Sequence, residues 1–177
     1  DDNQLFVWNA AGTAFAAVNA PGPTAIGVQN LLYNGSFEVT GGTTRAGAST
    51  TPPAGWRNLS TSAIGYTDPV GVGEGEGLAL RTTAAGGANE GVRQVLSNLK
   101  ASTAYVLRAR VKPVAVAGGC NISLTDGTST VTSTSTAAGS YQTLEGVTTT
   151  TAVPADVNVD LRSTADTNAC DWDEVTF

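Results

Sequence analysis

Short runs in which apolar and polar residues alternate recur along this 177-residue chain, and they limit its fold more than any other feature. In the clearest run, residues 105–112, one aromatic and three aliphatic side chains alternate with one valine and three basic residues. Because successive side chains of a strand point to opposite faces, this run predicts a strand with one buried face. Residues 120–125 and 157–162 alternate in the same way, and no long window repeats apolar residues at helical spacing. The sequence therefore predicts an all-β fold.

Turn residues and two N-terminal apolar runs predict how the chain is organised. Asp126-Gly127 tolerates positive φ at both positions and predicts a hairpin with a two-residue turn. Residues 5–8 and 14–18 are short apolar runs that predict a small N-terminal hairpin. Because an isolated two-stranded hairpin is marginal in water, we expect it to dock on the main domain or on another subunit. We therefore divide the chain into an N-terminal arm or hairpin at residues 1–29 and one domain at residues 30–177.

Composition excludes several classes of function. Nine Lys and Arg residues stand against 15 Asp and Glu, and the net charge of −6 argues against nucleic acid as a partner. No stretch of about 18 uninterrupted apolar residues is present, so we expect no membrane insertion. The chain has no histidine, which removes Ser-His-Asp and histidine-metal chemistry and leaves carboxylates and hard cations. Glu74 and Glu76 lie in a glycine-flanked loop that would not hold two acids in place, so we expect no enzyme.

The two cysteines, Cys120 and Cys170, are fifty residues apart. This spacing suits neither a zinc site nor a redox pair, and the chain offers no partner ligands for zinc. A disulfide is the preferred interpretation, and two buried free thiols are the alternative. A disulfide would place the protein outside a reducing cytosol, so we expect an extracellular or virion-surface location.

Several segments from residue 30 onward stand in an order that is typical of one fold family. They are residues 30–38 (NLLYNGSFE), Gly55-Trp56, residues 77–82 (GLALRT), residues 92–96 (VRQVL), the run that ends at Lys112, and the closing residues 172–177 (WDEVTF). This order resembles the jelly-roll carbohydrate-binding modules of families four, nine and twenty-two, which share the galactose-binding-like β-sandwich. The resemblance implies a jelly-roll β-sandwich preceded by the N-terminal hairpin or arm. Similar openings also occur in phage tail, fibre and head-surface proteins, so the resemblance is weaker for function than for fold.

The resemblance also implies a structural calcium ion at the sandwich edge, near the opening and closing strands. Carried over by position, its candidate ligands are Glu38 and Asp173. By alternation, Asp173 shares a face with Val175 and Phe177, so its carboxylate would point toward the core and need a cation or several hydrogen bonds. The alternative is an Asp173 that is hydrogen-bonded to backbone amides or paired with an arginine, without a metal.

Glycan binding needs exposed aromatic faces and polar side chains that pair with hydroxyl groups. Four aromatic residues occupy positions typical of a core, and Tyr141 lies in a strand where the resembled family has a packing aromatic. The candidates that remain are Tyr66, Trp8 and Trp172 as stacking platforms, and Arg108, Arg110 and Asp160 as outward polar residues. A solvated sheet surface explains these charges equally well, and the two arginines opposite Asp160 would make ordinary cross-strand pairs.

Two functions remain open at this stage. The first is a non-catalytic extracellular or virion-surface protein that decorates or anchors an assembly and binds surface glycans, with Phe6, Trp8 and Phe15 as the assembly arm. Its partners would be other subunits of a virion or surface assembly, with a homotrimer as one arrangement. The second is a carbohydrate-binding module of a secreted polysaccharide-degrading enzyme. Removal of residues 1–29 separates them, because it should abolish assembly in the first case and preserve sugar affinity in the second.

Overall fold

The computed structural model describes residues 5–8, 15–18, 30–37, 51–60, 62–67 and 79–177. The described residues form twelve strands and no helix. The strands are β1 (Leu5–Trp8), β2 (Phe15–Val18), β3 (Arg57–Asn58), β4 (Ala63–Thr67), β5 (Ala79–Thr83), β6 (Glu90–Leu96), β7 (Ala104–Pro113), β8 (Cys120–Thr125), β9 (Thr130–Thr134), β10 (Gln142–Thr149), β11 (Val157–Ser163) and β12 (Ala169–Thr176). No helix of the described residues has the length and apolar character needed to span a membrane.

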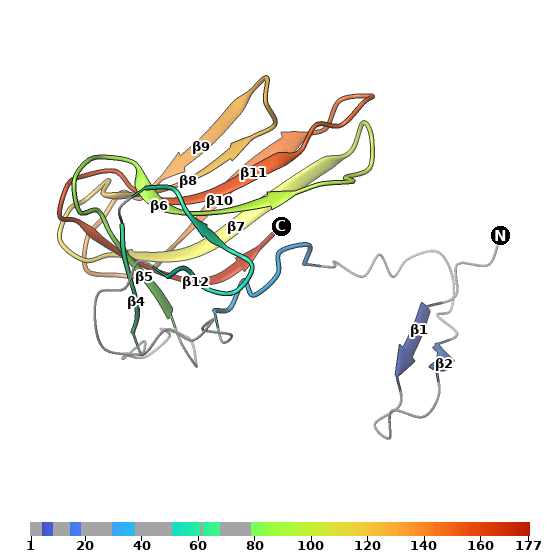
Figure 1. Ribbon diagram of the computed structural model, residues 1–177, viewed down its shortest axis with the longest axis horizontal. Helices are drawn as coiled ribbons and strands as arrows, with labels where there is room; N and C mark the ends of the chain where they lie inside the picture. Colours follow the sequence, from blue (N-terminus) through green and yellow to red (C-terminus); the bar gives the residue numbers. More distant parts are fainter. Residues whose placement is uncertain (1–4, 9–14, 19–29, 38–50, 61, 68–78) are drawn as a thin grey trace.

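Two antiparallel five-stranded sheets form a sandwich (Figure 1). We call the sheet of order β10-β7-β12-β5-β4 the front sheet and the sheet of order β3-β6-β11-β8-β9 the back sheet. The predicted all-β sandwich is therefore confirmed. β1 and β2 pair with each other, with Leu5 opposite Val18 and Trp8 opposite Phe15. The side chains of β1 and β2 lie outside the described residues, so the arm role of Phe6, Trp8 and Phe15 stays a prediction.

The core lies between the inner faces of the two sheets, as the alternation of the strands predicts. In β7, Leu107, Ala109 and Val111 are buried, whereas the alternate residues Val106 and Arg108 are exposed. The buried residues of β8 and β11 approach from the back sheet and complete the cluster. Apolar burial of this kind contributes about 25 cal/mol for each Å² removed from water, so the two inner faces hold the sheets together.

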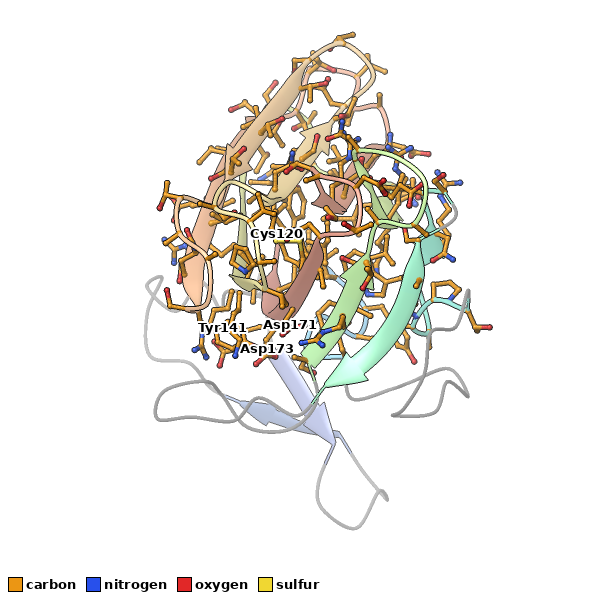
Figure 2. All side chains as sticks on the ribbon, turned by 90° about the vertical axis from the view of Figure 1, so that its left-hand side faces the viewer. Cys120, Tyr141, Asp171 and Asp173 are labelled. Atoms are coloured by element: carbon orange, nitrogen blue, oxygen red, sulfur yellow. A yellow bond between two sulfur atoms is a disulfide. The ribbon has the colours of Figure 1, made fainter. Side chains whose placement is uncertain are left out.

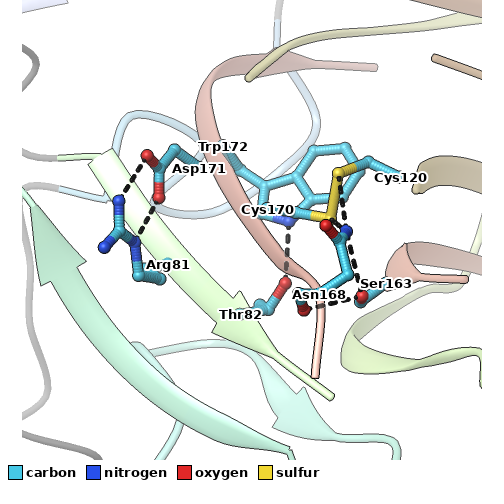
Figure 3. Close-up of polar contacts among 8 residues, drawn as sticks. All are labelled: Arg81, Thr82, Cys120, Ser163, Asn168, Cys170, Asp171 and Trp172. Atoms are coloured by element: carbon cyan, nitrogen blue, oxygen red, sulfur yellow. Dashed lines mark hydrogen bonds and ion pairs between the residues drawn. A yellow bond between two sulfur atoms is a disulfide. The ribbon is translucent and has the colours of Figure 1, made fainter. Parts of the chain in front are cut away.

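Trp172 belongs to this core, which corrects its assignment as a stacking platform. It is completely buried and lies in register with Val111 on one side and Leu80 on the other. Its indole Nε1 donates a hydrogen bond of 3.0 Å to Thr82 Oγ1 (Figure 3). Paired strand residues share a face, so the register with two core residues directs Trp172 inward.

A β-bulge in β12 corrects the predicted direction of Asp173. Asp173 lies opposite Arg110 and Thr176 lies opposite Arg108, so three steps along β12 match two steps along β7. The extra residue is accommodated where Glu174 adopts a positive φ of 48°. Because the bulge reverses the alternation, Val175 and Phe177 point into the core while Asp173 shares the outer face with Arg110.

The opening segment is tied to the closing strand by the side chain of Asn30. Its Nδ2 donates to the Val175 carbonyl at 3.0 Å, and its Oδ1 accepts from the backbone N–H groups of Leu32 and Phe177. Gly35 lies against the same strand, where an added Cβ would come within 2.1 Å of the Val175 oxygen. The Asn-Leu-Leu and Asn-Gly pieces of the opening motif are thus used to join the two ends of the domain.

The hairpin between β8 and β9 is present, but its turn is longer than predicted. Thr125 pairs with Thr130, which leaves four residues in the loop instead of two. Asp126 closes it: Oδ1 accepts the backbone N–H groups of Thr128 and Ser129, at 3.0 and 2.7 Å. These hydrogen bonds favour an Asx-type turn over the two-residue turn, because the carboxylate replaces a backbone acceptor.

The disulfide between Cys120 and Cys170 is confirmed, and it joins β8 of the back sheet to β12 of the front sheet. Both cysteines are completely buried. Asn168 is also buried, and its Nδ2 donates to the Gly119 carbonyl at 2.9 Å, beside the two sulfur atoms (Figure 3). A disulfide inside the core indicates a protein that folds in an oxidising, extracellular setting.

Reduction of this disulfide should destabilise the protein by about 4 kcal/mol, because the bridge closes a long loop in the unfolded chain. For a chain of this size, that loss lowers the melting temperature by roughly 10 °C. Differential scanning calorimetry with and without dithiothreitol measures it. The Cys120→Ala, Cys170→Ala double variant is the control and should not respond to dithiothreitol; an unchanged wild type would contradict the prediction.

Asp126 should give the hairpin a distinct acid sensitivity. Hydrogen bonds from the backbone N–H groups of Ser129 and Thr128 lower the pKa of Asp126 from its ordinary 3.8 to about 2. Because the folded pKa is the lower one, the carboxylate stabilises the fold above about pH 4, and this stabilisation is lost as the pH falls toward about 2. Urea unfolding between pH 7 and pH 2 should show Asp126→Asn less stable than wild type at neutral pH and equal to it at the acid end. Asp156→Asn, at an exposed loop position, should track wild type throughout.

Candidate functional site

The outer face of the front sheet carries charged side chains from four neighbouring strands, β10, β7, β12 and β5. Lys112 on β7, Asp171 on β12 and Arg81 on β5 lie in direct register, with Gly65 of β4 opposite Arg81. The next row on the same face contains Arg110 and Asp173. We call this surface the front face. Figure 2 labels Tyr141, Asp171 and Asp173 at this part of the domain.

Asp171 is buried although it points outward. It is 2% exposed, and Arg81 binds it through two parallel hydrogen bonds, Nε to Oδ1 at 2.6 Å and Nη2 to Oδ2 at 2.7 Å (Figure 3). The hydrogen bond with Asp171 raises the pKa of Arg81 above its ordinary value, and the charges of Asp171 and Tyr141 add to this rise against desolvation. The geometry gives a fixed guanidinium whose remaining N–H groups are available, because the Arg81 side chain is 40% exposed.

Tyr141, which the sequence analysis set aside at a position of a packing aromatic, lies on the front face. Its half-buried ring lies 5.1 Å from the guanidinium carbon of Arg110 and 5.3 Å from Nζ of Lys112. Both contacts are cation–π interactions, which orient an aromatic ring against charged side chains. Leu144, Gly146 and Thr148 of β10 are buried, so odd-numbered positions there face outward, and that alternation predicts the same side for Tyr141.

Arg108 and Arg110 form ion pairs within the front sheet, and neither reaches Asp160. Arg108 Nε lies 2.7 Å from Glu145 Oε2, and Arg110 Nη1 lies 3.3 Å from Glu174 Oε2. Asp160 lies on β11 of the back sheet, opposite Arg93. The predicted pairing of these arginines with Asp160 is therefore wrong, because the two groups stand on opposite outer faces of the sandwich.

Other predicted site residues are placed only in part. The backbone of Tyr66 pairs with Leu80, but the side chains of Tyr66 and Trp8 lie outside the described residues. Glu38 also lies outside them. Within the described ranges, no group of three His, Cys, Asp or Glu side chains could hold a metal ion. Asp173 Oδ1 accepts the backbone N–H of Glu174 at 2.8 Å and faces Arg110, as in the metal-free alternative, so calcium at Glu38 and Asp173 stays a prediction.

The front face offers both donors and acceptors of hydrogen bonds. Arginine and lysine supply N–H donors, the tyrosine hydroxyl both donates and accepts, and the carboxylates accept. The buried acids are held by their partners, so the side chains keep their geometry before a ligand arrives. This arrangement suits a ligand that is rich in hydroxyl groups.

Loss of Arg81 should destabilise the fold much more than loss of Arg108. Arg81→Ala leaves the buried Asp171 without its partner, at a cost of about 2 kcal/mol that is reduced by the partial exposure of Arg81. Arg108→Ala breaks an ion pair whose side chains are 62% and 48% exposed. Such a surface pair contributes about 0.5 kcal/mol or less. Urea unfolding of both variants tests the difference, and equal losses would contradict the buried geometry of Asp171.

Solved structures with the same fold include the following three. A Clostridium thermocellum xylanase 10B with CBM22-1 and GH10 modules, complexed with xylohexaose, is 16% identical over 69% of this chain and 25% of that chain, with a TM-score of 0.55. Tailspike protein 4 of bacteriophage CBA120 is 9% identical over 83% and 21%, with a TM-score of 0.61. The CBM22-1 xylan-binding domain of Paenibacillus barcinonensis Xyn10C is 22% identical over 80% and 88%, with a TM-score of 0.53.

These similarities show a β-sandwich of the kind found in carbohydrate-binding modules. Because all three identities are low, they extend to the fold and not to the function. The chain spans only a quarter and a fifth of the xylanase and the tailspike. A search of curated protein sequences gives no match. The model of the HpiC1-like family, described as HpiC1 cyclase, matches residues 28–177, and the chain belongs to this family.

Proposed function

We propose that the protein binds a polysaccharide and that the front face is its binding surface. The single observation that carries this proposal is Tyr141, half-buried between Arg110 and Lys112 and in the row that leads to the paired Arg81 and Asp171. Sugar recognition uses an aromatic ring for stacking and fixed hydrogen-bond donors and acceptors around it. The sandwich fold, which two xylan-associated proteins share, supports the same class of ligand.

A neutral polysaccharide fits the front face better than a charged one. Its described cations are Arg81, Arg108, Arg110 and Lys112, and each has an acidic neighbour on the same face: Asp171 beside Arg81 and Lys112, Glu145 beside Arg108, and Asp173 and Glu174 beside Arg110. The charges therefore balance. Hydroxyl groups bridge such donors and acceptors without leaving an ion uncompensated.

The family description favours a second function, because it names a cyclase. Asp171 and Asp173 are two carboxyl groups on one face of β12, about 6.6 Å apart along the strand at the usual rise per residue. Buried carboxyl groups are suited to donating or accepting a proton during bond formation. Under this alternative, the front face would bind a small substrate, and the expectation of a non-catalytic protein would be wrong.

The assembly role is a further form of the proposal. It assigns the arm residues Phe6, Trp8 and Phe15 to contacts with neighbouring subunits of a virion or surface assembly, with a homotrimer as one arrangement. The tailspike similarity supports it only at the level of fold. Deletion of residues 1–29 remains the experiment that separates this role from sugar binding.

Replacement of Tyr141 by alanine should weaken binding of soluble xylan about tenfold, which corresponds to one well-placed contact. Affinity gel electrophoresis measures the binding, and thermal melting should show that the variant folds. Tyr33→Ala is the matched control, because Tyr33 is 58% exposed and its backbone is bonded to Gln94 of the back sheet. Equal affinities of wild type and Tyr141→Ala, or no binding of any neutral polysaccharide, would refute the proposal and leave the cyclase alternative.

A further inference from the structure

The outer face of the back sheet carries a second polar surface, which the proposed function does not use. Strand register aligns one residue from each of the five strands in a single row across this sheet: Arg57, Arg93, Asp160, Ser123 and Thr132. A parallel row on the same face contains Gly91, Arg162, Asn121 and Thr134. We call the two rows together the back face.

The back face is positively charged in a protein that is negatively charged overall. Among its described residues, Arg57, Arg93 and Arg162 stand against Asp160 alone, which leaves a net charge of +2. The whole chain carries −6. The back face therefore differs from the balanced front face, where every described cation has an acidic neighbour.

Asp160 is completely buried and is shared by two arginines. Arg93 donates from Nε to Asp160 Oδ1 at 2.5 Å and from Nη2 to Oδ2 at 2.7 Å. Arg162 also donates to Oδ2, through its Nη2. The hydrogen bond that Arg93 donates to Asp160 raises the pKa of Arg93, so this guanidinium stays charged. One carboxylate neutralises only one of the two guanidinium groups, and its pairing holds both of them in fixed positions.

Arg57 adds an uncompensated charge to this row. It lies directly opposite Arg93 in the register of β3 and β6, its side chain is exposed, and no described residue forms a hydrogen bond or ion pair with it. Like charges that face each other across neighbouring strands destabilise a sheet. An anion bound between Arg57 and Arg93 would remove this repulsion.

Polar atoms beside the arginines also lack partners within the described residues. They are Ser123 Oγ, Asn121 Oδ1 and Arg162 Nε, and both Ser123 and Asn121 are more than nine-tenths buried. Ser123 lies opposite Asp160, and Asn121 lies opposite Arg162. Buried polar groups without partners are uncommon in native proteins, and a polar solute held at this surface is one explanation for them.

We propose that the back face binds an acidic polysaccharide, with Arg57 and Arg93 taking its carboxylate or sulfate groups and the exposed side chains of Thr132 and Thr134 taking its hydroxyl groups. The planar fork of arginine matches both of these anions. Nucleic acid is a poorer occupant, because the described back face holds no aromatic side chain for base stacking.

Binding of heparin, which carries sulfate groups, and of polygalacturonate, which carries carboxylates, tests the proposal at low salt. Arg57→Gln should weaken binding of at least one of them about fivefold, the effect of one exposed charge-assisted contact. Lys100→Gln is the matched control: it removes the same charge from an exposed residue outside the row and should change the affinity less than twofold. Added NaCl should weaken binding by wild type, because the contact is electrostatic.

A stability measurement separates binding from folding. Arg57→Gln removes a like-charge contact, so its melting temperature without ligand should equal or exceed that of wild type even though it binds less tightly. Heparin or polygalacturonate should raise the melting temperature of wild type more than that of Arg57→Gln, because ligand binding stabilises the folded state by mass action. Both results support the proposal.

Three results would overturn it: no binding of either acidic polysaccharide, equal weakening by Arg57→Gln and Lys100→Gln, or equally tight binding of duplex DNA with the same dependence on Arg57. The failure of this proposal and that of the xylan proposal are distinguishable. Tyr141→Ala should bind heparin and polygalacturonate as wild type does, and Arg57→Gln should bind xylan as wild type does, because the two residues lie on different sheets.

Discussion

The pairing of β12 between β7 and β5 is the interaction on which the rest of the structure depends. This strand comes last in the described chain, yet it occupies the centre of the front sheet. It carries Cys170, which bridges to the back sheet, and Trp172, which fills the core. Asn30 ties its end to the opening segment. The domain therefore closes only when its first and last segments meet, and such non-local pairing is characteristic of slowly folding β-sandwiches.

Each of the two outer faces contains a buried aspartate that is paired with an arginine. Asp171 on the front face and Asp160 on the back face are almost completely buried, and each receives two parallel hydrogen bonds from an arginine on the adjacent strand. Burying a carboxylate is costly unless it is paired in this way. What differs is the number of arginines for each acid, and this difference separates a balanced face from a cationic one.

Alternation in the sequence predicted much of this arrangement, and its one failure has a local cause. The inward residues of β7, β8 and β11 follow the predicted pattern. The pattern breaks in β12, where the bulge at Glu174 turns Asp173 outward while Val175 remains in the core. A bulge depends on the register of the partner strand, so alternation within one strand does not reveal it.

The sequence predicted the candidate binding surfaces less well than it predicted the fold. Outward positions on β7, β10 and β11 follow from alternation, but the strand order decides which of them meet. Asp160 was expected beside Arg108 and Arg110, yet the two groups belong to different sheets. Arg57 becomes a candidate binding residue because its register places it opposite Arg93. Tyr141 becomes one because its ring lies beside Arg110 and Lys112. These contacts join residues that are far apart in the chain, and local periodicity carries no information about them.

The sequence by itself determined the all-β class, the two-faced strands and the preferred pairing of Cys120 with Cys170, because side-chain period and cysteine count are local or compositional properties. Tertiary structure alone decided the strand order, the bulge in β12, the burial of Trp172 and the sorting of arginines into a balanced front face and a cationic back face. The physical reason is that each of these features depends on which strands become neighbours, and that is set by the packing of the whole sandwich.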